Sequence, residues 1–203
     1  MLPFHGADLC CGRYGSVVQL NFESPECIME TGKTRYKTAS ELAPMMSNVR
    51  SDMYEIKASF TLDSTTEIYD SGIFVRYNPT ENYIGTERTA IKFSNYGVYV
   101  DRLKSSLLDY VDKSDTWVVP NTGRNFDVTI YVDRSQLEIY INDIATITTR
   151  IYPKYGDSDY ISVFENGGNI RFTKFKITQM KGCFKDEVEP AYYGNTGNLG
   201  EAL

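Results

Sequence analysis

Histidine and tryptophan are nearly absent from this 203-residue sequence, which contains one of each. The histidine, His5, lies close to the N-terminus, where side chains are seldom held in place. Catalysis by a positioned histidine and a metal site made of several histidines are therefore disfavoured. The tryptophan, Trp117, stands in the apolar run 117–120, which predicts a strand edge packed in the core. The alternative for Trp117 is a platform on which a ligand stacks.

Long apolar runs and an excess of basic charge are also lacking. The sequence has no stretch of 18 apolar residues, so no membrane-spanning segment is predicted. The first twenty residues lack the basic start and apolar centre of a secretory signal, and the localisation stays open. Asp and Glu number 27 against 21 Lys and Arg, which gives a net charge of -6. This balance argues against nucleic acid or an anionic membrane as a partner.

The four cysteines form no recognisable framework. Cys10 and Cys11 are adjacent, Cys27 and Cys183 are isolated, and no C-x-x-C spacing occurs. This pattern disfavours both a pair of designed disulfides and a zinc site, so free thiols are predicted. We accordingly expect neither a metal site nor a cofactor.

What the sequence does contain is alternation of apolar and polar residues. Three consecutive runs between 126 and 151 alternate in this way, with polar turns at 133–135 and 142–143, which predicts a β-meander. The run 54–62 alternates in the same manner, and 73–75, 91–93 and 98–100 also read as strands. The period changes phase between Phe172 and Phe175, which suggests a bulge in the last strand. A short amphipathic turn is expected at 39–42, ended by Pro44.

Several separated blocks resemble the C-terminal β-sandwich module of glycoside hydrolase family 32, which includes invertases, levanases and inulinases. The similarity runs from about residue 52 to residue 181 and keeps the order of the family's blocks. These blocks are 72–76 (GIFVR), 97–102 (GVYVDR), 132–143 (VDRSQLEIYIND), 149–153 (TRIYP) and 161–168 (ISVFENGG). The resemblance implies an all-β fold, namely a sandwich of two antiparallel sheets of the concanavalin-like jelly-roll type.

The catalytic motifs of that family are missing. Its propeller domain carries carboxylates in N-D-P, R-D-P and E-C-P motifs, whereas this sequence has no Asp-Pro dipeptide, and Glu26-Cys27 is followed by Ile28. Glycoside cleavage requires a positioned pair of carboxylates. We therefore predict no catalytic residue here and expect a fragment or partner of a family 32 glycosidase. Whether the chain works as part of an enzyme stays open.

The resemblance also suggests how the chain is divided. We expect residues 1–48 to be a leader and a connection to a missing propeller, 49–181 to be the sandwich, and 182–203 to be a flexible tail. The last segment is acidic and then rich in glycine and asparagine, with little to bury.

Two functions are compatible with such a module. It is either an accessory module that stabilises the propeller of a fructan- or sucrose-cleaving enzyme, or a free-standing lectin for fructose or levan. A sandwich with an unrelated partner is a third alternative. The candidates for contacts with a fructosyl sugar are Arg76, Tyr83, Glu87, Glu165 and Asn166. Charged and amide groups of this kind bind vicinal hydroxyls, but each also has a structural alternative, such as a surface ion pair or a turn.

Overall fold

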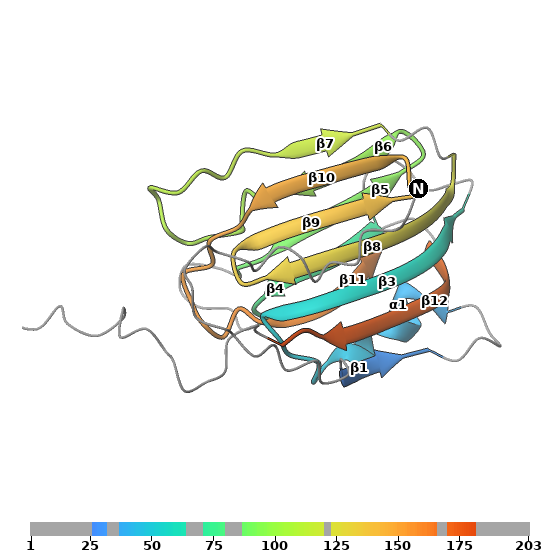
Figure 1. Cartoon of the computed structure of the whole chain (residues 1–203), viewed down its shortest axis with the longest axis horizontal. Coiled ribbons are helices and arrows are strands. Elements are labelled where there is room, and N and C mark those ends of the chain that lie inside the picture. Colours follow the sequence, from blue (N-terminus) through green and yellow to red (C-terminus); the bar gives the residue numbers. More distant parts are fainter. Residues whose placement is uncertain are drawn as a thin grey trace, which may run out of the picture. The chain divides into compact units, whose positions relative to one another are not determined.

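The computed structural model describes residues 26–31, 37–63, 71–79, 87–119, 123–165 and 170–181. These residues form two antiparallel sheets that face each other, which confirms the predicted all-β sandwich (Figure 1). The first sheet has the order β1 (Glu26–Glu30), β12 (Ile170–Gln179), β3 (Met53–Leu62), β8 (Asn125–Asp133), β9 (Gln136–Ile141) and β10 (Ala145–Arg150), with β2 (Lys37–Thr38) beside β12. The second has the order β11 (Tyr160–Glu165), β4 (Ser71–Tyr77), β5 (Thr89–Ser94), β6 (Gly97–Asp101) and β7 (Thr116–Val118).

The core lies between the two sheets and is built from alternate residues of each strand. In β3, the five residues of the predicted apolar face are at most 2% exposed: Tyr54, Ile56, Ala58, Phe60 and Leu62. The Phe60 ring contacts Phe93, Phe126 and Phe172, with centroids 4.8 to 5.3 Å apart. Because Phe93 belongs to the other sheet, these rings join the two layers. Burial of such side chains is the main force that holds a sandwich together.

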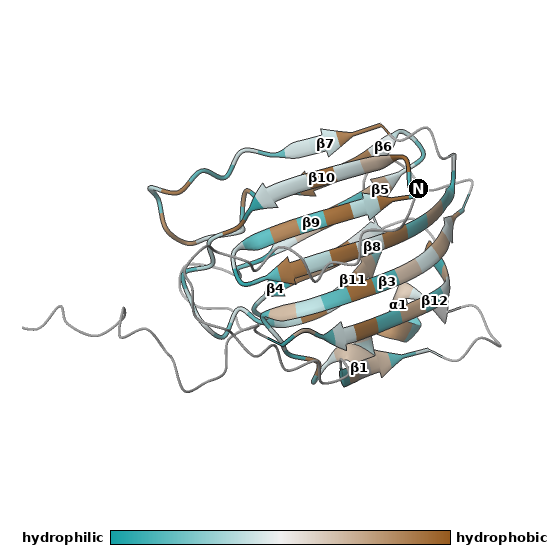
Figure 2. Ribbon diagram, in the orientation of Figure 1, coloured by the Kyte–Doolittle hydropathy of each residue, from teal (hydrophilic) through white to brown (hydrophobic). Residues whose placement is uncertain are grey.

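The predicted meander is confirmed as strands β8, β9 and β10. Ile139 pairs with Ile130 on one side and with Ile147 on the other, and it is fully buried. Its neighbour Tyr140 points to the opposite face and is 42% exposed, so the predicted phase of β9 is correct. Figure 2 shows the resulting alternation of apolar and polar residues along β8 and β9.

The sandwich starts before residue 49, where we had expected its first residue. Strand β1 pairs with β12, and β2 pairs with the other end of β12. The expected helical turn is α1 (Ala39–Leu42), which is capped by Thr38 and Glu41 in a capping box. The α-helical turn ends at Leu42, and a 3-10 helix with Pro44 in its first turn, η2 (Ala43–Met46), follows it directly. Ala39, Leu42 and Met46 are buried in these turns, so this segment is part of the folded unit.

The predicted bulge in β12 is also confirmed, because the register with β3 shifts between Phe172 and Lys174. No helix among the described residues is long and apolar enough to cross a membrane. Three of the four cysteines, the strand expected at 17–22 and the tail expected at 182–203 lie outside the described residues. The fourth cysteine, Cys27, is an exposed free thiol.

Candidate functional site

Arg76, the first candidate, is buried near the end of β4. A bulge places two residues, Val75 and Arg76, opposite one residue of β11, and Arg76 takes the left-handed conformation, with φ at 48°. As a result, Phe74 and Tyr77 lie on the same outer face of the sheet, with ring centroids 5.3 Å apart. Arg76 turns away from that face and is only 6% exposed. Its Nε and Nη1 have no hydrogen-bond partner.

Glu87 is an internal acceptor in the described structure. Its side chain is 1% exposed. Oε1 accepts from the backbone N–H groups of Leu107 and Lys154 at 2.9 and 2.7 Å. Oε2 accepts from the backbone N–H of Tyr155 and from the hydroxyl of buried Ser158. The carboxylate therefore joins two loops, and a sugar would reach it only by displacing these donors.

Glu165 lies at the other end of the sandwich. It pairs with Ser71 across the β11–β4 ladder, and Arg76 stands five residues further along β4. At about 3.3 Å per residue, the two positions are roughly 16 Å apart along the strand. Arg76 and Glu165 therefore do not meet at one end of the sandwich. Glu165 instead accepts a hydrogen bond from Ser40 in α1.

The remaining candidates, Tyr83 and Asn166, lie outside the described residues. Of the three described candidates, Arg76 and Glu87 are near the same end of the sandwich. A backbone hydrogen bond from Asn78 to Glu87 joins their two strands there. Both side chains are buried, so neither forms an open sugar site in this conformation.

Trp117 lies on the surface, which corrects the predicted core position. It is 65% exposed. The reason is its register on the edge strand β7, where Thr116 and Val118 pair with the buried Val100 and Val98. Trp117 lies between them, opposite Tyr99, and so points outward. Its apolar neighbours in the sequence suggested burial, but the edge position leaves the outer side of the strand uncovered.

Trp117 belongs to a set of aromatic residues on the outer side of the five-stranded sheet. We call this set the aromatic face, and it comprises Phe74, Tyr77, Tyr99, Trp117 and Phe164. The rings of Phe74 and Phe164 stack with centroids 4.1 Å apart. Two cations lie above this face, since Arg88 covers the Phe74 ring and Lys92 approaches the Tyr99 ring. An outer sheet face of this composition is typical of a contact surface.

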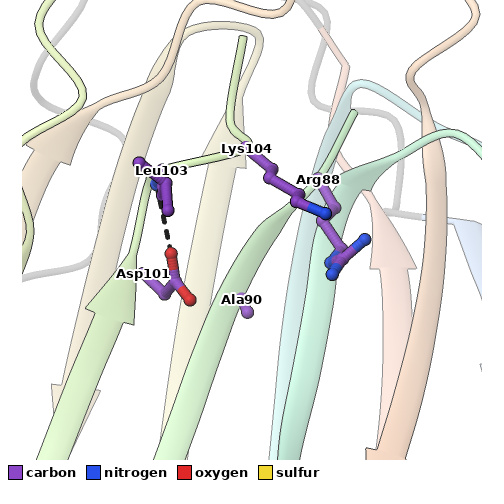
Figure 3. A pocket seen from close by; sticks show the side chains of 5 residues that line it. All are labelled: Arg88, Ala90, Asp101, Leu103 and Lys104. Carbon is purple, nitrogen blue, oxygen red and sulfur yellow. Dashed lines mark hydrogen bonds between the residues drawn. The ribbon is translucent and has the colours of Figure 1, made fainter. Parts of the chain in front are cut away.

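A shallow hollow of about 60 Å³ lies on the same face, lined by Arg88, Ala90, Asp101, Leu103 and Lys104 (Figure 3). Asp101 accepts from the ammonium of Lys92 at 2.7 Å and from the backbone N–H of Leu103 at 3.1 Å. Ligand pockets usually enclose roughly 300–1,000 Å³, so this hollow alone does not enclose a sugar. A more open hollow of about 340 Å³ lies at the other end of the sandwich, lined by Thr61, Leu62, Asp63, Arg124 and Arg171.

Arg102 is a structural centre that the sequence analysis did not identify. It is 5% exposed, and its guanidinium donates to the Ser114 carbonyl at 2.6 Å and to Asp112 at 3.2 Å. It also donates to the carbonyl of Arg150 at the end of β10 in the other sheet. Arg102 thereby fixes the loop before β7 and connects the two sheets. The only sequence signal for it was its place at the end of the block 97–102.

No group of three or more His, Cys, Asp or Glu side chains within the described ranges is arranged to hold a metal ion.

Comparison with known proteins gives a family match. Residues 25–179 match the family model described as "Glycosyl hydrolases family 32 C terminal". Among curated proteins, none matches this chain.

Similar solved structures share the fold at low sequence identity. A fructosyltransferase from A. japonicus is 18% identical with a TM-score of 0.57, covering 81% of this chain and 28% of that one. An exo-inulinase from Aspergillus awamori is 16% identical with a TM-score of 0.54, covering 82% and 30%. Fructan 1-exohydrolase IIa from Cichorium intybus is 17% identical with a TM-score of 0.53, covering 68% and 33%. The chain spans about a third or less of the length of these proteins.

Proposed function

The chain belongs to the family of glycosyl hydrolase family 32 C-terminal domains, and from this membership we propose that it is a non-catalytic accessory module. It packs against a family 32 catalytic propeller, in cis or in trans, and stabilises it. The substrate of the complete enzyme would be a fructan or a sucrose-derived sugar. The observation that carries the proposal is the difference between the outer faces of the two sheets.

The outer face of the larger sheet is polar. Its β3 strand presents Glu55, Lys57, Ser59 and Thr61, and the neighbouring strand β12 adds the charged residues Arg171, Lys174 and Lys176. The five-stranded sheet presents the aromatic face instead. Burying aromatic side chains against a partner is favourable, whereas burying unpaired charges is costly. The aromatic face is therefore the surface that we assign to the propeller.

The proposal is tested with the catalytic propeller of a family 32 enzyme, produced without its own sandwich domain. We expect the chain to bind it and to raise its melting temperature. Trp117→Ala should weaken binding about 30-fold, as loss of an interface tryptophan typically does. Tyr140→Ala, which removes an exposed aromatic residue from the other sheet, is the matched control and should bind like wild type. Equal loss in both variants, or no binding by wild type, would contradict the assignment.

Direct sugar binding is a second proposal, and the exposure of Trp117 beside Tyr99 favours it, since such rings stack on the C–H faces of sugars. A lone module gains few hydrogen bonds in competition with water, so we expect a Kd on the order of micromolar to millimolar. Calorimetry with levan and inulin oligosaccharides tests this in wild type, Trp117→Ala and Arg76→Ala. If both variants bind as tightly as wild type, neither Trp117 nor Arg76 contacts the sugar. If the wild-type chain binds neither levan nor inulin oligosaccharides, the sugar-binding proposal is contradicted and the accessory role is the only proposal left.

A further inference from the structure

Buried polar atoms without partners gather at one end of the sandwich. Five such side-chain atoms occur among the described residues: the Tyr54 hydroxyl, Arg76 Nε and Nη1, Thr89 Oγ1 and Glu165 Oε2. The first four belong to residues near the same end, while Glu165 lies at the other. A buried donor or acceptor without a partner is costly, so most native proteins satisfy such groups with protein, water or a ligand. Four of them in one place require an explanation.

The backbone brings these three residues together. The bulge in β4 turns Arg76 toward the space between the sheets, and Val75 beside it pairs with Thr89 of β5. Tyr54 reaches the same space from β3 in the other sheet. Burial raises the pKa of Tyr54, and the charge of Arg76 and a contact from the Arg76 backbone N–H lower it in part. The N–H contact occupies only an acceptor site of the Tyr54 hydroxyl, whose proton stays free to be donated. Tyr54 and Thr89 are fully buried, and Arg76 is nearly so.

The chemistry of the cluster favours an anion. The guanidinium can only donate, and the two hydroxyls are free to donate, so the missing group is an acceptor. Arg76 has no ion pair within the described part of the chain. Of the carboxylates at this end of the sandwich, Asp159 is paired with Arg50 at 2.8 Å and Asp52 is exposed. The buried Glu87 carboxylate accepts from Leu107, Lys154, Tyr155 and Ser158, none of which is Arg76. A buried guanidinium without a counter-charge is among the most unfavourable groups in a protein interior.

We propose that Tyr54, Arg76 and Thr89 form a binding site for a small oxyanion, either inorganic phosphate or a small carboxylate. The anion oxygens would accept from Arg76 and the two hydroxyls, and the negative charge would offset that of the guanidinium. Charge-assisted hydrogen bonds of this kind are stronger than neutral ones. The site is internal and separate from the aromatic face, so it does not depend on the proposed accessory function.

The test measures thermal unfolding of the full chain in increasing sodium phosphate or sodium acetate, at an ionic strength held constant with sodium chloride. We expect a saturable rise in melting temperature, of roughly 5–10 °C when the anion exceeds its Kd a hundredfold. The arm with the larger rise identifies the preferred oxyanion. Arg76→Met should abolish the rise. Arg171→Met removes an arginine whose side chain is 58% exposed, and it should leave the rise intact as the matched control.

Thr89→Val keeps the size of the side chain and removes only the hydroxyl. This variant provides a test if Arg76→Met does not fold. We expect it to weaken phosphate binding several-fold, as measured by calorimetric titration. The proposal would be overturned if the melting temperature rose equally with anion concentration in wild type, Thr89→Val and Arg171→Met. A crystal structure grown in phosphate or acetate in which only water occupies the cluster would also overturn it.

Discussion

At the scale of single residues, burial decides what each charged group does. Glu87 resembles a sugar ligand in the sequence, but its carboxylate is enclosed and accepts four hydrogen bonds from two loops. Asp101 lies on a surface and holds a single lysine and a backbone N–H. Removing the first carboxylate should therefore affect folding much more than removing the second.

Glu87→Gln should destabilise the protein by about 2–4 kcal/mol. The amide replaces one acceptor oxygen by a donor, which then faces N–H groups that have no other partner. Urea unfolding of the variant measures the loss. Glu26→Gln on the exposed surface of β1 is the control. If Glu26→Gln shifted the urea midpoint as much as Glu87→Gln does, the hydrogen bonds of Glu87 to the two loops would not be important for stability.

Asp101 should stabilise the fold at neutral pH and lose this effect at acidic pH. Burial raises the pKa of this carboxyl, but the hydrogen bonds from Lys92 and Leu103 lower the pKa by more than burial raises it. The pKa of Asp101 therefore lies below the ordinary value of 3.8. A depressed pKa stabilises the fold at pH values above 3.8, and this contribution is lost as the pH falls through the folded-state pKa. Asp101→Asn should reduce stability at pH 7 and flatten its decline between about pH 5 and 2. Asp109→Asn at an exposed site should leave the denaturation profile unchanged.

At the scale of elements, the phase of a strand determines which residues support the core. Ile139 lies at the centre of β9 between two isoleucines. Ile139→Ala should leave a cavity and lower the free energy of unfolding by roughly 2–5 kcal/mol. Thr148→Ala, on the exposed face of the neighbouring strand β10, should change it little. Similar melting temperatures for the two variants would mean that the phase of β9 is misassigned.

The strands with regular alternation were predictable because one buried face imposes a period of two. This held for β3, β8 and β9 and for the bulge in β12. The prediction failed for Trp117, since an apolar run does not reveal that its strand lies at an uncovered edge. It also failed to reveal the burial of Arg76, because a bulge shifts the phase by one residue and turns a nominally outward residue inward. The contacts of Glu87 and Arg102 join distant loops, and local patterns carry no information about them.

At the scale of the whole molecule, the described part of the chain is a sandwich with one mainly polar and one aromatic outer face. We expect the purified chain to release no fructose from sucrose, inulin or levan, because no motif positions a pair of carboxylates for glycoside cleavage. A reducing-sugar assay on protein from two independent preparations measures this. Turnover that follows the protein through purification and is abolished by changing one of its carboxylates would contradict the accessory role.

The pairing of β1 with β12 also joins two segments that are far apart in the sequence. Glu26 lies opposite Gln179, so almost the whole described chain separates the two partners. During synthesis at roughly 5–20 residues per second, β1 would wait on the order of ten seconds for its partner. Contacts between such distant segments also slow folding after release, since the chain must close a long loop first. Until β12 is made, β1 has no partner strand and the side of β3 that β12 later covers is open, so both can pair with a strand of another chain.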